Sequence, residues 1–245
     1  MPTAKKPPLL FIHGFRGTHE GLVDVAVWMT DRGYECYYPD IPPFGRESKP
    51  LKTYDEKSYA KFIADYIKQN KLKNPVLIGH SMGSLIAAAT AAKYPRLVSK
   101  KLVLLSPISV KPPKPIAMLQ PLITILPNKV IGFITTKYML IQKKDHNKVR
   151  DILDVTYRCG AHYTSRKDVR KAAKFSADHS LSDFKFKKDT LIVAGEKDRL
   201  ISRSKTEDYA KTIKVEPKFI KNSGHLINYE EPRRVAEIIS DFLEN

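Results

Sequence analysis

Short runs of apolar residues alternate with amphipathic stretches along most of the chain. Each run ends near glycine, proline or polar residues, and its length is typical of a buried strand. The predicted strands cover residues 9–12, 36–38, 76–78, 101–105, 190–194 and 218–220. Between them apolar residues recur at helical spacing, and the predicted helices cover about 22–29, 55–70, 84–94, 204–213 and 232–243. This alternation indicates an α/β fold, with a mostly parallel sheet of about six strands covered by helices on both faces.

The alternation breaks after the fourth predicted strand. Residues 108–183 contain helical patterns but no clear strand, so we expect a helical insertion into a core formed by residues 1–107 and 184–245. Its segment 116–141 is strongly apolar, and a membrane-spanning helix needs about 20 largely uncharged residues. The residues that interrupt this segment are Pro121, Pro127, Asn128, Lys129 and Lys137. Two or three short amphipathic helices therefore fit the pattern better than a membrane span.

The apolar side chains of the insertion have two alternative roles. They would either line a pocket for an acyl or aromatic group, or pack the insertion onto the core. The residues concerned are Met118, Leu119, Leu122, Ile123, Ile125, Leu126, Ile131, Phe133 and Ile134.

The chain of 245 residues carries a net charge of +17, which favours anionic partners through long-range attraction. Its basic residues are nevertheless spread out, and the local concentrations at 143–144, 166–174 and 185–188 are not interleaved with aromatic residues. No stacking platform or nucleic-acid motif is present, so we expect no nucleic-acid partner. Because basic segments flank the apolar stretch, a weak contact with an anionic membrane or a lipid-like substrate is a hypothesis.

The two cysteines, Cys36 and Cys159, are too few for a disulfide scaffold and match no metal-binding or redox spacing. We expect ordinary thiols in a reducing compartment. No apolar segment of a signal peptide follows residues 1–8, so the predicted location is cytoplasmic. The spacing of Gly14 and Gly17 is not that of a dinucleotide site, and the sequence predicts no cofactor and no metal.

The segment Gly79-His80-Ser81-Met82-Gly83 lies between the third predicted strand and a helix rich in small residues. Glycines on both sides of the serine allow a strained turn and a close approach of strand and helix, so that the hydroxyl projects above the edge of the sheet. This is the geometry that a nucleophile needs. The alternative is a glycine-rich turn with an incidental serine.

A serine hydroxyl is a poor nucleophile, so it needs a histidine base and an acid that orients the histidine. Asp198 follows the fifth predicted strand and His225 follows the sixth, which places both at the same sheet edge as Ser81. Their order along the chain is the one that this type of site requires. Glu196 and Asp189 are the alternative acids.

The developing oxyanion needs two backbone N–H donors. Met82 directly follows the candidate nucleophile, and Phe15 lies in the glycine loop after the first predicted strand, with Arg16 as its rival. We expect His80 to support the turn and His13 to order its loop through hydrogen bonds.

Four segments carry a family resemblance: His13-Gly14-Phe15, Gly79-His80-Ser81-Met82-Gly83, Gly195-Glu196-Lys197-Asp198 and Gly224-His225. Together they resemble the cap-bearing branch of the α/β-hydrolase superfamily. The resemblance implies that the insertion is a cap or lid over the site. The two antiparallel strands that often precede the first motif in this superfamily have no counterpart here, which implies a trimmed sheet of six parallel strands. A serine at this turn, in place of aspartate, excludes the chemistry of the related dehalogenases and epoxide hydrolases.

The resulting prediction is a cofactor-free serine hydrolase that cleaves carboxylic esters of small to medium acyl chains through an acyl-serine intermediate. In this prediction Ser81, Asp198 and His225 are catalytic, and Phe15 and Met82 form the oxyanion hole. Monoacylglycerol lipase, thioesterase and carbon–carbon bond hydrolase activities would use the same three residues. The alternative from another class is a non-catalytic ligand-binding protein on the same scaffold.

Overall fold

The computed structural model describes residues 6–45, 49–112, 126, 128–142, 146–152 and 165–245, without the side chains of residues 128 and 129. Its six strands form one parallel sheet, as the sequence predicts, and their order in the sheet is β2-β1-β3-β4-β5-β6. The strands are β1 Leu9–Ile12, β2 Cys36–Tyr37, β3 Val76–His80, β4 Lys101–Leu105, β5 Asp189–Gly195 and β6 Lys218–Ile220.

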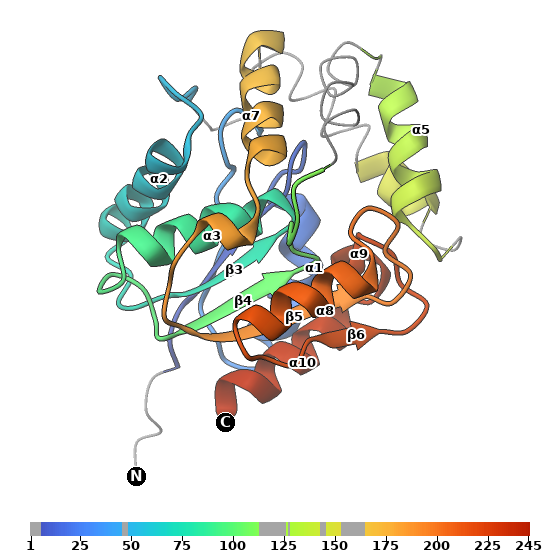
Figure 1. The fold of residues 1–245 in the computed structure, drawn as a ribbon. Helices are drawn as coiled ribbons and strands as arrows, with labels where there is room; N and C mark the ends of the chain where they lie inside the picture. The colour runs from blue at the N-terminus through green and yellow to red at the C-terminus, as the bar shows by residue number, and fades with distance from the viewer. Residues whose placement is uncertain (1–5, 46–48, 113–125, 127, 143–145, 153–164) are drawn as a thin grey trace.

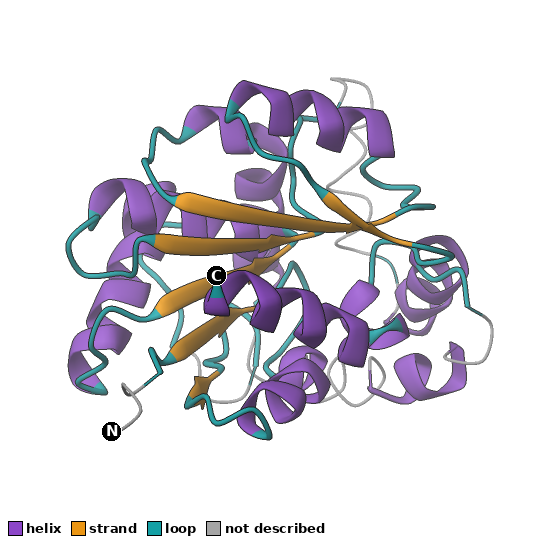
Figure 2. Ribbon diagram, turned by 90° about the horizontal axis from the view of Figure 1, so that it is seen from below, coloured by secondary structure: helices purple, strands orange, loops and turns teal. Residues whose placement is uncertain are grey.

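Helices cover both faces of this sheet, which Figure 2 shows between two groups of helices. The helices are α1 Glu20–Thr30, α2 Glu56–Gln69, α3 Met82–Lys93, α5 Asn128–Met139, α7 Arg166–Asp178, α8 Arg203–Thr212, α9 Ile227–Glu230 and α10 Pro232–Glu244. The side chains of β1 alternate between the two faces. Leu10 and Ile12 pack in one cluster with α2, α3 and α7, whereas Leu9 and Phe11 pack in the other with α1 and α10. Both faces are therefore buried, as a parallel sheet requires.

The strand order changes direction between β1 and β3. The chain runs from β1 outward to β2, and then returns to place β3 on the other side of β1. In open parallel sheets the loops that follow two such strands diverge at their carboxyl ends and leave room for a ligand. Gly14 follows β1 and Ser81 follows β3, so two of the predicted motifs lie at this point.

The insertion between β4 and β5 contains α5 and α7, which Figure 1 shows on the same side of the molecule. Helix α7 buries Ala172 and Phe175 in the same cluster as α2 and α3, and the Phe175 ring lies 4.8 Å from that of Tyr59, centroid to centroid. This part of the insertion packs on the core. The division into a core and a cap at residues 108 and 183 stays a prediction.

The exposure of residues in and just before α5 contradicts part of the expected pocket lining. Ile131 is buried against Leu226 and Tyr229. Phe133 and Ile134, by contrast, are 56% and 48% exposed, and Leu126 is 37% exposed, so these three side chains face solvent rather than an enclosed pocket. The other five residues of that prediction, Met118, Leu119, Leu122, Ile123 and Ile125, lie outside the described residues. No helix in the described part of the chain is long and apolar enough to cross a membrane.

His13 ties the loop after β1 to the loop after β2. Its Nδ1–H donates to the carbonyl oxygen of Gly14 at 2.9 Å, which leaves Nε2 to accept the N–H of Ile41 at 2.8 Å. The side chain is buried, and burial lowers the pKa of the imidazole to about 4. His13 is therefore neutral at pH 7 and orders its loop through hydrogen bonds.

We expect this neutral histidine to make stability depend on pH. Between pH 6.5 and about 4 the unfolded chain binds a proton at residue 13 that the folded protein does not bind. The contribution of His13 is therefore complete above pH 6.5 and is lost as the pH falls, by about 1.4 kcal/mol per pH unit. The free energy of unfolding should be measured with urea at several pH values between 4.5 and 6.5. It should rise with pH less steeply in His13→Gln than in the wild type, by a difference that corresponds to about one proton. Unfolding at pH 8, where residue 13 is neutral in both states, measures the cost of the lost hydrogen bonds alone. Equal slopes for the two proteins would contradict a neutral His13.

Candidate active site

Ser81 occupies a strained turn between β3 and α3. Its backbone has φ of 52° and ψ of −118°, a region that favours glycine. The flanking glycines are needed for close packing: a Cβ at Gly79 would lie 2.3 Å from the Gly83 oxygen, and a Cβ at Gly83 would lie 2.0 Å from the oxygen of Ile12. The turn is therefore pressed against β1 and α3. Its strain is compensated by the burial of α3, of which ten residues are buried.

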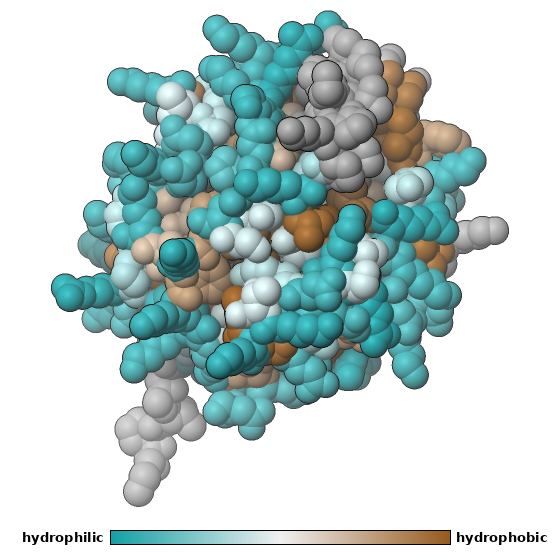
Figure 3. All heavy atoms as spheres, in the orientation of Figure 1, coloured by the Kyte–Doolittle hydropathy of each residue, from teal (hydrophilic) through white to brown (hydrophobic). Residues whose placement is uncertain are grey.

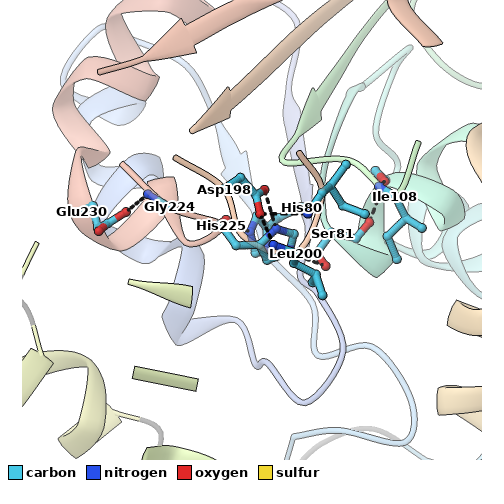
Figure 4. Close-up of polar contacts among 10 residues, drawn as sticks. His80, Ser81, Ile108, Asp198, Leu200, Gly224, His225 and Glu230 are labelled. Atoms are coloured by element: carbon cyan, nitrogen blue, oxygen red, sulfur yellow. Dashed lines mark hydrogen bonds and ion pairs between the residues drawn. The ribbon is translucent and has the colours of Figure 1, made fainter. Parts of the chain in front are cut away.

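The structure brings Ser81, His225 and Asp198 into one hydrogen-bonded chain (Figure 4). The Nδ1–H of His225 donates to Oδ2 of Asp198 at 2.8 Å. Because Nδ1 carries the proton, Nε2 is free to accept the hydroxyl proton of Ser81, and these two atoms are 2.9 Å apart. Of the three acids weighed from the sequence, Asp198 is the one that contacts His225, whereas Glu196 lies near Arg203.

Asp198 is held in its charged form. Burial on its own would raise the pKa of this carboxyl group, but His225 and the N–H groups of Leu200 and Ile201 lower it further than burial raises it. These two N–H groups donate to Oδ1 at 2.8 and 3.0 Å, on the side of the carboxylate opposite His225. A buried carboxylate with a full set of donors keeps a fixed orientation, and it stabilises a positive charge on the imidazole.

The main chain of His225 is also held on both sides. Its N–H donates to the carbonyl oxygen of Met139, at the end of α5, at 2.9 Å. Its carbonyl oxygen accepts the Nε2–H of His80 at 3.1 Å. Burial lowers the pKa of His80 to about 3, so this imidazole stays neutral and supports the site without titrating near pH 7. The contact with Met139 could not be foreseen, because only the carbonyl group of that residue is used.

The expected oxyanion donors lie beside the serine. A Cβ at Gly14 would be 3.0 Å from the Cβ of Ser81, which places the loop that carries Phe15 directly against the candidate nucleophile. In the described part of the chain, the N–H groups of Phe15 and Met82 make no hydrogen bond. Two unused donors close to the serine are what an oxyanion hole needs. Their role stays a prediction.

The described residues contain no group of three histidine, cysteine or acidic side chains that could hold a metal ion. Cys36 is a half-buried free thiol whose pKa is raised by burial, and Cys159 lies outside the described residues.

Comparisons with known proteins agree with this geometry. The family model described as "Serine aminopeptidase, S33" matches residues 3–232. The chain is 26% identical over 258 residues to "Putative esterase/lipase 2" of Mycoplasma pneumoniae, an alignment that covers 100% of this chain and 91% of that protein. It is 26% identical over 260 residues to "Monoacylglycerol lipase ABHD6" of Homo sapiens, which covers 97% of this chain and 75% of that protein.

The fold is also that of a solved esterase. The esterase EaEST from Exiguobacterium antarcticum superimposes with a TM-score of 0.85 at 20% identity, and the match covers 98% of this chain and 93% of that one. Since the family model extends over most of the sequence, the chain belongs to the serine aminopeptidase S33 family of the α/β-hydrolase superfamily.

Proposed function

We propose that this protein is a serine hydrolase that cleaves carboxylic esters through an acyl-Ser81 intermediate. The observation that carries the proposal is the continuous chain of hydrogen bonds from Asp198 through His225 to Ser81, at 2.8 and 2.9 Å. Relatives named esterase or lipase support the reaction class. The complete geometry argues against the alternative of a non-catalytic binding protein, which would have no need for a strained serine aligned with a base.

The reaction follows from the positions of the protons. His225 Nε2 takes the hydroxyl proton as Ser81 Oγ attacks the ester carbonyl carbon, and the N–H groups of Met82 and Phe15 hold the resulting oxyanion. When the intermediate collapses, the imidazolium gives this proton to the leaving alcohol, and the acyl group stays on Ser81. His225 then deprotonates a water molecule that attacks the acyl carbon, and the proton returns to Ser81 as the acid leaves. Asp198 keeps Nδ1 protonated throughout and stabilises the imidazolium.

The proposed substrates are esters of small to medium acyl chains, with residues 108–183 as the cap that selects among them. Monoacylglycerols are the next candidate class, because a relative is named monoacylglycerol lipase. Thioester and carbon–carbon bond hydrolysis would need the same nucleophile and base. The cytoplasmic location and the absence of a nucleic-acid partner stay predictions.

We further propose a weak contact between α5 and anionic lipid surfaces. Val130, Phe133, Ile134 and Tyr138 are between 40% and 56% exposed and fall on one face of α5, because they are three, four and eight residues apart. Figure 3 shows hydrophobic side chains at the surface in the region of α5. Lys137 places its ammonium group 5.4 Å from the centroid of the Phe133 ring.

Cations beside this apolar face give it the chemistry of a lipid-binding helix. Arg199 donates to the main-chain carbonyl oxygen of Lys137, so a second positive charge lies at this end of α5. Neither side chain forms an ion pair with the described residues. An exposed apolar face with free cations fits an anionic lipid surface, where each lysine or arginine contributes about 1 kcal/mol. Since Met139 of the same helix contacts His225, such a surface would approach beside the site.

Removal of the nucleophile should abolish hydrolysis. The wild type should cleave p-nitrophenyl esters and react covalently with a fluorophosphonate, whereas Ser81→Ala should lose labelling completely and hydrolysis by about 10³-fold or more. Ser204→Ala, at an exposed serine of α8, is the matched control and should still be labelled. An unlabelled wild type would favour the non-catalytic binding protein.

Substitution of each candidate carboxylate should show which one orients His225. Asp198→Asn keeps the shape but no longer stabilises the Nδ1–H tautomer, so kcat should fall by about 10⁴-fold. Glu196→Gln, two residues away and near Arg203, should stay within about twofold of the wild type. A nearly normal Asp198→Asn together with an inactive Glu196→Gln would move the role to Glu196.

The lipid contact should depend on charge and on the apolar face. The wild type should co-sediment with phosphatidylglycerol vesicles more than with phosphatidylcholine vesicles, and Phe133→Ser and Lys137→Gln should each weaken binding by about five- to tenfold. Lys205→Gln, at an exposed lysine of α8, is the charge-matched control. Equal binding to the two kinds of vesicle would rule out the proposed contact.

A further inference from the structure

Glu230, the last residue of α9, is a buried carboxylate that the catalytic mechanism does not use. It is 3% exposed. Its Oε2 accepts the N–H of Gly224 at 2.5 Å, and its Oε1 accepts the N–H groups of Ile141 and Gln142 at 2.5 and 2.8 Å. Figure 4 shows the contact with Gly224 on the side of His225 opposite Ser81. The carboxylate therefore lies behind the loop that carries the base.

The donors around Glu230 come from two distant parts of the chain. Ile141 and Gln142 are the second and third residues after the end of α5 in the insertion, whereas Gly224 precedes His225 after β6. A buried charge is costly unless hydrogen bonds satisfy it, and bonds to a charged acceptor are about twice as strong as neutral ones. A single side chain thus joins the end of α5 to the loop of His225.

A second set of contacts joins the same two segments. The N–H of His225 donates to the oxygen of Met139 at 2.9 Å. The backbones are so close that a Cβ at Gly224 would lie 2.2 Å from that oxygen. The main chain on the N-terminal side of the imidazole is therefore held against the insertion at two successive residues, 224 and 225.

We propose that Glu230 is a positioning residue that holds the His225 imidazole at the right distance for proton transfer and makes this distance depend on the insertion. The inference rests on the proposed ester hydrolysis. Glu230 does not touch the reacting atoms, so its effect has to pass through the placement of His225. A displacement of about 1 Å of a catalytic group can cost about 100-fold in rate.

The two proton transfers of acylation provide a specific signature. An alkoxide leaving group needs the proton that His225 delivers, whereas p-nitrophenolate is stable enough to leave without it. A misplaced imidazole should therefore slow the cleavage of an alkyl ester more than that of the p-nitrophenyl ester of the same acid. A loss of folded protein would lower both rates by the same factor.

The test is Glu230→Gln, which keeps the shape but replaces one acceptor oxygen with an NH₂ group. This NH₂ must face either Gly224 or the pair Ile141 and Gln142, and each of these presents N–H donors. We expect kcat/KM for p-nitrophenyl acetate to fall about tenfold and that for ethyl acetate about 100-fold, with an unchanged circular dichroism spectrum. Both esters form the same acetyl-Ser81, so kcat/KM isolates the acylation step.

The matched control is Glu231→Gln. In the described part of the insertion, the Glu231 carboxylate accepts a hydrogen bond only from the side-chain amide of Gln142, at 2.7 Å. The control removes the same charge one residue away and leaves both backbone links intact, so both rates should stay within about twofold. An equal loss for the two esters in Glu230→Gln, or the same discrimination in Glu231→Gln, would overturn the positioning role.

Ile141→Pro tests the same contact from the insertion, and it replaces the first variant if Glu230→Gln fails to fold. Proline has no N–H, so this variant removes one donor to Glu230 and leaves Glu230 and Gly224 unchanged. The proposal expects a larger loss with ethyl acetate than with p-nitrophenyl acetate here too, and equal rates would overturn it. A wild type that cleaves neither ester would instead refute the proposed function itself.

Discussion

The close packing of α3 against β1 and β3 is the constraint on which the rest of the site depends. Where the backbones meet, any side chain at residue 79 or 83 would collide with carbonyl groups within 2.3 Å. This contact forces Ser81 into its positive-φ turn, and it also brings the loop after β1 beside the serine. The burial of α3 offsets the strain, so the protein holds Ser81 in this conformation without a bound ligand.

The site combines two neutral buried histidines with one charged buried carboxylate. His13 and His80 are buried and neutral, and they act through fixed hydrogen bonds. Asp198 is buried but charged, because its donors and His225 outweigh the effect of burial. This leaves His225 as the histidine of the hydrogen-bonded chain, with one nitrogen fixed by Asp198 and the other directed at Ser81.

The insertion is connected to this site through main-chain atoms and one carboxylate. Met139 contacts His225 directly, and Glu230 joins the segment after α5 to Gly224. The same insertion buries Phe175 against Tyr59 and exposes the apolar face of α5 that contains Phe133. It therefore packs on the core, contacts His225 and presents an exposed apolar face, rather than serving only as the wall of a pocket.

The sequence alone determined the parallel sheet and the positions of Ser81, Asp198 and His225 at its edge. Strands and glycine turns are marked by local patterns, and the carboxyl ends of parallel strands lie at the same edge of a sheet. It did not predict the short helix α9 at 227–230, since four residues carry no periodicity. Only the tertiary structure decided which apolar residues of α5 are buried and that the Glu230 carboxylate accepts hydrogen bonds from backbone N–H groups. Burial depends on distant partners, and the N–H groups that hold Glu230 belong to the main chain, which no side-chain pattern marks.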